Sequence, residues 1–358
     1  MMNRRIDQFL YQKEKPIWEK ILLSPLTLLS LPYGGVVRTR SFFYSIGLFK
    51  TKRLPCPVIS VGNITVGGTG KTPFVMALAK GMMKKGIPVA ILSRGYKRRK
   101  TSPSIVSDGQ RIFLSLEESG DEPLLMAKAC QGIPILVGKN RFVNGQIALQ
   151  RFGVKGLLLD DAYQHLPLYR NINILLIDSK IGFGDQHLLP RGILREPLSS
   201  LRRASFLVLT KVEDIKRGHD LQKKIHHLHP SLPIFHSYYE PVGLIGPNGE
   251  QKALEVYKGK RVLAFSGIAQ SNYFISLLKK SGMEVAREMT YPDHHLYRAE
   301  DLNSIEEMSK GMDGVVTTEK DMVKLKEWKI PGIPLFALRI EVQIWEEEAF
   351  YEKVMEIF

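Results

Sequence analysis

From residue 57 onward, short apolar runs alternate with longer stretches in which apolar and polar residues are mixed. The runs are rich in Val, Ile and Leu, which is typical of strands that are buried on both faces of a sheet. The alternation therefore predicts an α/β fold with a mostly parallel sheet. The predicted strands are residues 57–61, 88–92, 134–137, 156–160, 172–177 and 206–210, and the predicted helices between them include residues 73–85 and 121–129.

A second alternating set follows a polar, helix-like stretch at residues 213–229. It comprises predicted strands at residues 261–265, 284–287 and 314–318, and an amphipathic helix near residues 273–281. We interpret this set as a smaller α/β domain whose boundary lies near residues 215–230. The sequence thus predicts three parts: an N-terminal segment (1–50), a larger α/β domain (51–220) and a smaller C-terminal α/β domain (221–358).

Residues 1–50 have a pattern of their own, in which apolar residues are interrupted by lysines and arginines. The longest apolar run, at residues 21–31, contains Pro25 and is far shorter than the roughly 20 residues that a transmembrane helix needs. Acidic residues precede it, which argues against a signal peptide, so we expect the protein to stay on the cytoplasmic side. Apolar surface with cationic flanks is typical of an amphipathic segment at a membrane interface. The alternative is a helix pair packed on the domain.

The composition of the chain indicates which classes of partner it binds and which kinds of cysteine site it lacks. The 358 residues include 51 Lys and Arg against 36 Asp and Glu, which gives a formal net charge of +15. That surplus favours anionic partners such as nucleic acid, phospholipid headgroups or an acidic substrate. The two cysteines, Cys56 and Cys130, are far apart and lack metal-ligand spacing, which argues against a disulfide framework or a zinc site.

The most specific motif follows the first predicted strand, where GNITVGGTGKTP occupies residues 62–73. A strand, a glycine-rich loop, Lys-Thr and a helix form a P-loop, whose backbone amides cradle nucleotide phosphates. Lys71 would reach the β- and γ-phosphates, and the Thr72 hydroxyl would bind Mg²⁺. The generic motif has glycine at position 65, where this chain has Thr65, and a glycine-rich turn without nucleotide is the alternative. The candidate nucleotide-binding residues are Thr65, Val66, Gly67, Gly68, Thr69, Gly70, Lys71 and Thr72.

Carboxylates stand at the ends of predicted strands. Asp160 and Asp161 follow an apolar strand, as the magnesium-binding acid of P-loop enzymes does, and Asp178 is a weaker candidate of the same kind. A helix cap or a solvated turn is the alternative. Asp121 and Glu122 begin a predicted helix and could supply the carboxylate that accepts a proton from a phosphorylated hydroxyl, although aspartate there is commonly a cap.

The remaining candidate site residues carry basic or imidazole side chains. Asp293, His294 and His295 lie in the second predicted domain, where a carboxylate could tune the basicity of a histidine, or where they could form an ordinary loop. The cationic loop at residues 93–100 could grip an anionic substrate or lipid headgroups, or be simply solvated. Arg141 follows another strand, on the side where α/β sheets bind ligands.

At these residues the chain closely resembles the tetraacyldisaccharide 4'-kinase family, the lipid A kinases of Gram-negative bacteria. The matching segments are SVGNITVGGTGKTP (60–73), SRGYKR (93–98), GDEP (120–123), DDAYQH (160–165), LLPRGILREP (188–197) and YPDHH (291–295). They span most of the chain in order and are specific in combination. The threonine at position 65 also belongs to this family's version of the loop.

The resemblance implies Mg-ATP-dependent phosphorylation of the 4'-hydroxyl of a tetraacylated glucosamine disaccharide 1-phosphate, a lipid A precursor. It implies two α/β domains with nucleotide near their junction, and a monomer at the cytoplasmic face of the bacterial inner membrane, whose N-terminal segment touches an anionic bilayer.

The resemblance also implies residue roles. Asp121 would be the catalytic base, supported by His294, although the neighbouring His295 leaves that choice open. Asp160 and Asp161 would organise Mg²⁺, and Arg141 would join Lys71 in stabilising phosphate charge. The implied substrate-binding residues are Tyr96, Glu122, Gln164, Arg191 and Arg195.

Two other functions remain as alternatives. A regulatory P-loop GTPase or ATPase is suggested by the sequence TKVE at residues 210–213, which faintly mimics a guanine-reading Asn-Lys-x-Asp loop. Thr210 and Glu213 replace both key residues of that motif, so guanine preference is poorly supported. A basic nucleic-acid-binding ATPase would bind RNA or DNA with strong salt dependence. The sequence shows no aromatic stacking motif of the RNA-binding kind, and we expect no nucleic-acid partner.

Overall fold

The structure is a computed structural model that describes residues 16–96, 98, 102–214, 219–325 and 328–358. The first fifteen residues of the predicted N-terminal segment lie outside the described residues. The same holds for Lys97, Arg99 and Lys100 of the predicted cationic loop.

The larger half of the molecule is built on parallel strands, as the sequence predicts. Hydrogen-bonded neighbours follow the order β3-β4-β2-β5-β1-β6-β7, and every pair is parallel except β3 with β4 at the edge. In this half the strands that were predicted lie within one residue of the predicted bounds, which confirms the α/β fold with a mostly parallel sheet. The strands are β1 (Val58–Gly62), β2 (Val89–Ser93), β3 (Ser104–Ser107), β4 (Ile135–Val137), β5 (Gly156–Asp160), β6 (Ile172–Asp178) and β7 (Phe206–Thr210).

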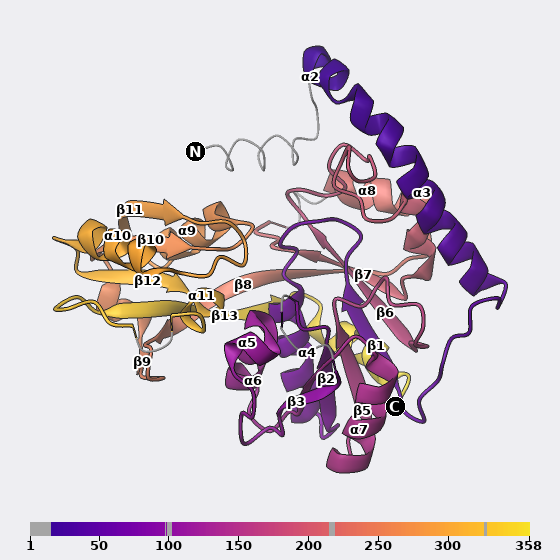
Figure 1. Cartoon of the computed structure of the whole chain (residues 1–358), viewed down its shortest axis with the longest axis horizontal. Coiled ribbons are helices and arrows are strands. Elements are labelled where there is room, and N and C mark those ends of the chain that lie inside the picture. The colour runs from indigo at the N-terminus through magenta and orange to yellow at the C-terminus, as the bar shows by residue number, and fades with distance from the viewer. Residues whose placement is uncertain (1–15, 97, 99–101, 215–218, 326–327) are drawn as a thin grey trace.

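The smaller half continues the same thirteen-stranded sheet in the order β8-β13-β12-β10-β11, with β9 paired to β8. Figure 1 shows the long strands β8 and β13 running from one half into the other. The first residues of β8 pair in parallel with β7, and the remainder pairs antiparallel with β13. Neither β8 nor β13 was predicted. These strands are β8 (Ile234–Ile245), β9 (Gln251–Lys252), β10 (Arg261–Ser266), β11 (Glu284–Thr290), β12 (Gly314–Thr318) and β13 (Leu335–Ile344).

Helices cover both faces of the sheet because successive strand residues point to opposite sides. Ile59 and Val61 of β1 belong to one core with α4, α6 and α12, whereas Val58 belongs to another with α7. The second half has its own pair of cores, under α9 and α10. The helices are α4 (Lys71–Lys84), α5 (Leu116–Ser119), α6 (Asp121–Ala129), α7 (Arg141–Phe152), α8 (His219–Leu228), α9 (Ser271–Lys280), α10 (Ala299–Ser309), α11 (Glu319–Met322) and α12 (Glu347–Met355), with 3-10 turns η1 (Leu198–Arg203) and η3 (Leu254–Tyr257).

Two helices that the sequence assigned to the C-terminal domain pack on the first half. Leu221 and Ile225 of α8 join the core under β6 and β7. Phe350 of α12 is fully buried, with its ring centroid 5.4 Å from that of Phe206 and 5.8 Å from that of Phe74. The division at residues 220/221 stays a prediction, and the contacts of α12 show that the chain returns to the first half at its end.

Near the N-terminus, two helices extend along the first half (Figure 1): α2 (Ile17–Leu22) and α3 (Ser24–Ser45). The small residues Ser30 and Gly34 face the protein, where the Ser30 hydroxyl donates to the Leu188 carbonyl at 3.0 Å. A Cβ on Gly34 would lie 2.8 Å from the Leu188 side chain, so a larger residue here would require that side chain to move. Among the residues that the structure describes, none of the helices combines the length and apolar character that a membrane crossing requires.

The buried ring of Phe350 generates a stability prediction. Replacing Phe350 by Ala should lower the free energy of unfolding by about 3–5 kcal/mol, because it leaves a cavity where α12 meets the first half. Chemical denaturation measures the change. The exposed Phe113 supplies the control, since Phe113→Ala should cost less than about 0.5 kcal/mol. Equal costs for the two variants would contradict this account of how the chain's end is anchored.

Candidate active site

The loop between β1 and α4 has the backbone geometry of a phosphate cradle. Gly67 and Gly70 adopt φ angles of 105° and 82°, in the left-handed region that favours glycine. Gly70 directly precedes α4, so the amides of the first helical turn and the helix dipole face the loop. The Asn63 amide donates to the Thr69 hydroxyl at 2.9 Å and accepts from the Lys71 ammonium at 3.3 Å. The loop is therefore held in shape by its own side chains.

The two aspartates at the end of β5 lie beside this loop but in different surroundings. Asp161 pairs with Lys71 at 3.6 Å and with Arg195 at 3.3 Å. Burial alone would raise the pKa of Asp161, but the two cations outweigh it and lower the pKa. Burial raises the pKa of Asp160 to about 7, and the charges of Glu122 and Asp161 add to the rise. Asp161 is thus paired with two cations, whereas Asp160 forms no ion pair with a cation among the residues that the structure describes.

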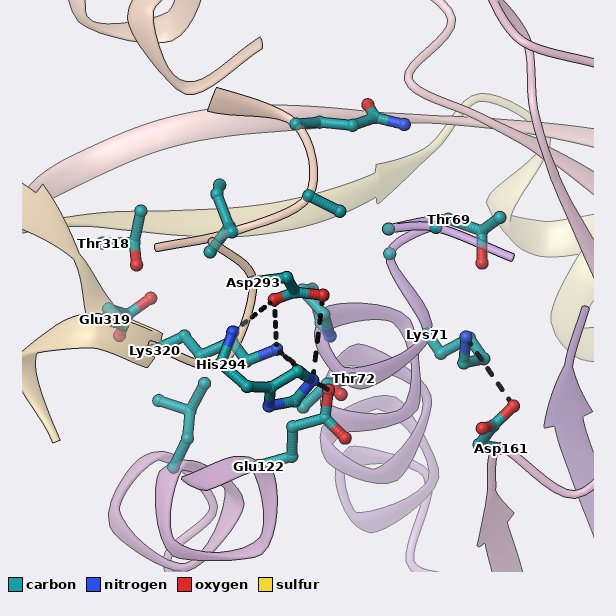
Figure 2. A pocket seen from close by; sticks show the side chains of 18 of the residues that line it. Thr69, Lys71, Thr72, Glu122, Asp161, Asp293, His294, Thr318, Glu319 and Lys320 are labelled. Carbon is teal, nitrogen blue, oxygen red and sulfur yellow. Dashed lines mark hydrogen bonds and ion pairs between the residues drawn. The ribbon is translucent and has the colours of Figure 1, made fainter. Parts of the chain in front are cut away.

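Across the cavity, the second half contributes a histidine that touches a carboxylate of the first half. The Nδ1 of the His294 imidazole lies 2.8 Å from Asp121 Oδ2. Its Nε2 lies 3.1 Å from the Lys320 ammonium (Figure 2). Because an ammonium can only donate, Nε2 accepts from Lys320 and Nδ1–H donates to Asp121. The neighbouring His295 instead contacts Asp301 at 2.9 Å. The geometry therefore distinguishes the two histidines, which the sequence left open.

The Asp121 carboxylate is held in its ionised form. Burial on its own raises the pKa of Asp121, but the hydrogen bond from His294 and the charge of Lys320 outweigh burial, and the pKa is lowered. Its Oδ1 accepts from the Glu122 amide at 2.9 Å. Lys320 also pairs with Glu122 at 3.3 Å and with Asp293 at 3.2 Å, and these acids raise its pKa. A compact network of charges thus spans the two halves.

The loop, the acid pair and the His294 network line one cavity of about 560 Å³ between the two halves. This volume suits a small-molecule ligand, since such sites span roughly 300–1,000 Å³. One end is polar and carries the loop, Asp160, Asp161, Arg195 and His294. Much of the remaining lining is apolar and comes from α4 and the second half: Met76, Ile268, Ala269, Tyr273, Phe274, Leu277, Leu338 and Ile340.

Several sequence-predicted residues line this cavity, and others do not. Among the described residues, the lining includes Gly67 to Thr72, Tyr96, Glu122, Asp160, Asp161, Arg195 and His294. Tyr96 is exposed, and its ring centroid lies 5.1 Å from that of His294. Asp121 is not part of this lining, but it contacts His294 at 2.8 Å. The structure brings together, at one cavity, residues that are separated by more than 220 positions in the sequence.

The remaining predicted residues hold the surroundings of the cavity in place. Arg141 donates to the Asp160 carbonyl at 3.0 Å, and burial lowers its pKa to about 10. The Gln164 amide donates to the Asn63 carbonyl at 2.7 Å. Arg191 donates to the Thr27 hydroxyl of α3 at 2.9 Å. These contacts give each side chain a structural partner next to the loop, the strand end or α3.

Thr65 and Val66, at the start of the loop, bond to the segment that precedes η1. The Val66 amide donates to the Ile193 carbonyl at 2.8 Å, and Thr65 forms a bridge with Leu194. The first two loop residues are therefore tied to this segment, whereas Gly67 to Thr72 line the cavity.

The sequence missed three residues of the site: Lys320, Lys211 and Gln270. Lys320 follows β12, a predicted strand, and the general rule that ligands bind at carboxyl ends of parallel strands could have identified it. Lys211 follows β7 in the same way. Gln270 carries no such signal, because a lone glutamine in a loop resembles any solvated residue.

The residues at the polar end fit a magnesium ion. Asp160 Oδ1 is buried and has no hydrogen-bond partner among the described residues, so this oxygen is available to bind a cation. The described residues contain no cluster of three or more His, Cys, Asp or Glu side chains with metal-binding geometry. Magnesium in phosphoryl-transfer sites is held by one or two carboxylates together with substrate phosphates, so Asp160, Asp161 and Thr72 suffice.

Comparisons with known proteins agree on one family. The model of the family described as tetraacyldisaccharide-1-P 4'-kinase matches residues 20–358. The chain is 40% identical over 337 residues to a tetraacyldisaccharide 4'-kinase from Desulfatibacillum aliphaticivorans, which covers 91% of this chain and 90% of that protein. It is 41% identical over 357 residues to one from Syntrophus aciditrophicus strain SB, with 93% and 94% covered.

A solved structure agrees with the sequence relatives. The "apo" form of LpxK from Aquifex aeolicus, crystallised in complex with ATP, matches with a TM-score of 0.76 at 35% identity and covers 94% of this chain and 99% of that chain.

The cationic surroundings of His165 generate a prediction about pH. Burial lowers the pKa of His165 to about 3, and the charges of Arg141 and Arg170 add to the fall. In the unfolded chain His165 becomes protonated below about pH 6.5, whereas in the folded chain it stays neutral down to about pH 3. The free energy of unfolding should therefore fall by about 2 kcal/mol from this group between pH 7 and 5.

Denaturation of the His165→Asn variant at both pH values checks the prediction. The variant should lose less stability on acidification than the unchanged protein, because asparagine does not titrate. His226→Asn on the exposed surface of α8 is the matched control. An identical acid-induced loss in His165→Asn and in the unchanged protein would show that His165 titrates normally.

Proposed function

The chain belongs to the tetraacyldisaccharide-1-P 4'-kinase family, and from this premise we propose that its cavity transfers the γ-phosphoryl group of ATP to the 4'-hydroxyl of a tetraacylated glucosamine disaccharide 1-phosphate, a lipid A precursor. One observation supports the proposal most directly. The phosphate loop at Lys71 and His294 line the same cavity, and His294 is hydrogen-bonded to Asp121, although these residues lie on different elements of the two halves.

The nucleotide occupies the cavity along its length. The triphosphate lies on the amides of Gly67 to Thr72, with Lys71 at the β- and γ-phosphates. The apolar part of the lining, which includes Ile268, Phe274 and Leu338, receives the adenine ring. Support for ATP comes from the match to the LpxK structure in complex with ATP. Binding the phosphates releases Lys71 from its pair with Asp161, because the phosphates carry more negative charge.

The Asp121–His294 pair acts on the proton of the attacking hydroxyl. The 4'-oxygen forms a bond to the γ-phosphorus, the bond from that phosphorus to the bridging oxygen breaks, and ADP leaves. Asp121 takes the hydroxyl proton, and His294 and Lys320 stabilise the arrangement. The lowered pKa keeps Asp121 ionised at neutral pH and ready to accept this proton. Arg141 supports the phosphate charge from behind the end of β5.

We infer that Mg²⁺ is held by the Thr72 hydroxyl, Asp160 and Asp161, where the buried Asp160 Oδ1 lacks a partner among the described residues. The ion supplies neutralisation of the charge on the transferring phosphates. Tyr96, Glu122 and Arg195 line the cavity and contact the sugar and its phosphate. Gln164 and Arg191 support this end indirectly, through Asn63 and Thr27.

We propose that α2 and α3 contact an anionic membrane surface at the cytoplasmic face of the bacterial inner membrane. Because small residues of α3 face the protein, its large apolar side chains face outward: Leu28, Leu29, Leu31, Val36 and Phe42 are all more than half exposed, as are Trp18 and Ile21 of α2. Such an exposed apolar stripe is costly in water and typical of an interfacial helix. The formal charge of +15 adds attraction to anionic headgroups.

The contacts of residues 210 and 211 argue against the alternative of a regulatory GTPase. Thr210 and Lys211, the residues that mimic a guanine-reading loop, bond to backbone carbonyls of the phosphate loop. We also infer that the protein acts as a monomer, since every group proposed for the transfer belongs to a single copy of the chain.

The function predicts the behaviour of an assay and of one variant. Labelled ATP, Mg²⁺ and a tetraacyl disaccharide 1-phosphate should give a lipid product with one additional phosphate. Asp121→Asn should lower kcat about 10²–10⁴-fold, because general-base catalysis contributes that much, while the Kd for ATP stays within about twofold.

The exposed Asp220 of α8 provides the matched control, and Asp220→Asn should retain normal turnover. The double variant Asp121→Asn/His294→Asn should be little slower than Asp121→Asn alone, because the two residues act as one unit. Near-normal turnover of Asp121→Asn would remove the proposed base, and the absence of any lipid product would refute the kinase activity itself.

The outward face of α3 predicts membrane binding. Leu28→Asp/Leu31→Asp should weaken binding to vesicles of phosphatidylglycerol and phosphatidylethanolamine at least about tenfold, because each leucine loses favourable transfer from water. Cosedimentation measures the binding. Ile112→Asp/Phe113→Asp, which changes exposed apolar residues elsewhere, should bind normally. Unchanged pelleting of the α3 variant would mean that this face does not contact lipid.

A further inference from the structure

Lys211 is a buried lysine that contacts both halves of the molecule. It directly follows β7 and adopts a φ of 59°, an uncommon conformation for a residue with a side chain. Its ammonium donates to the Gly68 carbonyl of the phosphate loop at 2.6 Å and to Asp178 Oδ2 at 2.8 Å. The third bond goes to the side-chain oxygen of Gln270. All three protons of the ammonium therefore have partners.

The preceding residue reinforces the same contact. The Thr210 hydroxyl donates to the Thr69 carbonyl at 3.1 Å, so residues 210 and 211 hold two successive carbonyls of the loop. In a planar trans peptide the N–H group points opposite to the carbonyl. Holding the Thr69 carbonyl against β7 therefore fixes the direction of the Gly70 N–H, one of the amides that a phosphate would meet. The orientation of the cradle thus depends on these two residues.

Gln270 brings the second half into this arrangement. It precedes α9, and its amide nitrogen donates to Asp178 Oδ2 at 2.9 Å while its oxygen accepts from Lys211. The neighbouring Ala269 lies against the loop, since a Cβ built on Gly68 would be 3.3 Å from the Ala269 Cβ. The segment before α9 therefore rests directly on the phosphate loop, and the two hydrogen bonds of Gln270 hold it there.

Stability alone does not account for such a buried ion pair. The side chains of Lys211 and Asp178 are 4% and 2% exposed. The free energy needed to remove two charges from water is about as large as the free energy of their attraction. Proteins in which apolar residues replace such an ion pair are therefore often equally stable. Asp178 is also fully satisfied, because its Oδ1 accepts from the amides of Lys180 and Ile181. A pair that adds little net stability, yet is placed against the cradle, points to a positional role.

We propose that Lys211 is a positioning residue for the phosphoryl transfer, which holds the Gly68–Thr69 segment of the loop in its nucleotide-binding shape and, through Gln270, couples that shape to the placement of the second half. The inference rests on the proposed ATP site. It also gives the Thr-Lys sequence at residues 210–211 a role other than reading a base.

Two variants and a stability-matched control test the proposal in the full-length protein. Gln270→Ala removes only the contact from the second half, and Lys211→Met removes the ammonium. Each should raise the KM and the Kd for ATP about tenfold and leave the KM for the disaccharide within twofold. The double variant should be no worse than Lys211→Met alone, because Gln270 acts through Lys211.

Lys324→Met is the control, because Lys324 is the other lysine that is buried against an aspartate, with Asp321 Oδ1 at 2.7 Å. It should lower the Tm as Lys211→Met does, yet keep a normal KM for ATP. Should Lys211→Met fail to fold, Gln270→Ala still decides the matter, since this side chain is only half-buried.

The outcomes separate this inference from the proposed function. A lowered Tm with an unchanged KM for ATP in both variants would overturn the positioning role and leave Lys211 as a structural residue. Equal increases in the KM values of ATP and the disaccharide would overturn it as well. If the unchanged protein binds no ATP in the presence of Mg²⁺, the proposed function fails before the variants are compared.

Discussion

The pairing of β8 with β7 on one side and β13 on the other is the constraint on which the rest of the molecule depends. Because one strand belongs to both halves, the parallel strands of each half direct loops to a common cavity. In the first half, β1 leads into the phosphate loop, and β5 ends at Asp160. In the second half, β10 leads to Gln270, and β12 leads to Lys320. Ligand sites at the carboxyl ends of parallel strands are the rule in α/β sheets, and here two such edges meet across one space.

The sequence predicted the strands that are buried on both faces, but it did not predict β8 and β13, the two strands that join the halves. Strands such as β5 are continuous apolar runs, so their pattern has one interpretation. β8 is not a continuous buried run, because it contains the exposed Glu240 and Val242 with Pro241 between them, and proline within a run argues against a strand. In the structure, Pro241 lies at the register shift between β8 and β13, where the ladder is irregular and the missing N–H is tolerated. A local pattern cannot reveal a partner strand that lies about a hundred residues away.

The same contrast explains which site residues the sequence revealed. Lys71, Asp160 and Asp121 occur in segments whose local chemistry is distinctive, and all three lie at or beside the cavity. Lys320 and Gln270 have meaning only after the second half is folded against the first, because their partners Glu122 and Asp178 come from distant elements. Arg191 and Gln164 occur in matching segments, but their side chains bond to Thr27 and Asn63, which only the three-dimensional contacts show.

The position of α3 links the outer apolar surface to the polar end of the cavity. The Tyr33 hydroxyl of this helix donates to the Arg195 carbonyl at 2.9 Å, and the Arg195 guanidinium pairs with Asp161, which in turn pairs with Lys71. A cavity of about 560 Å³ is the size of a site for one small ligand, far too small for a nucleotide and four acyl chains together. The acyl chains of a tetraacylated substrate must therefore stay outside, where Leu28 and its exposed neighbours offer an apolar surface. We propose that this helix faces the bilayer on one side; because it supports Arg195 on the other, its position sets how far from the membrane the transferred phosphate lies.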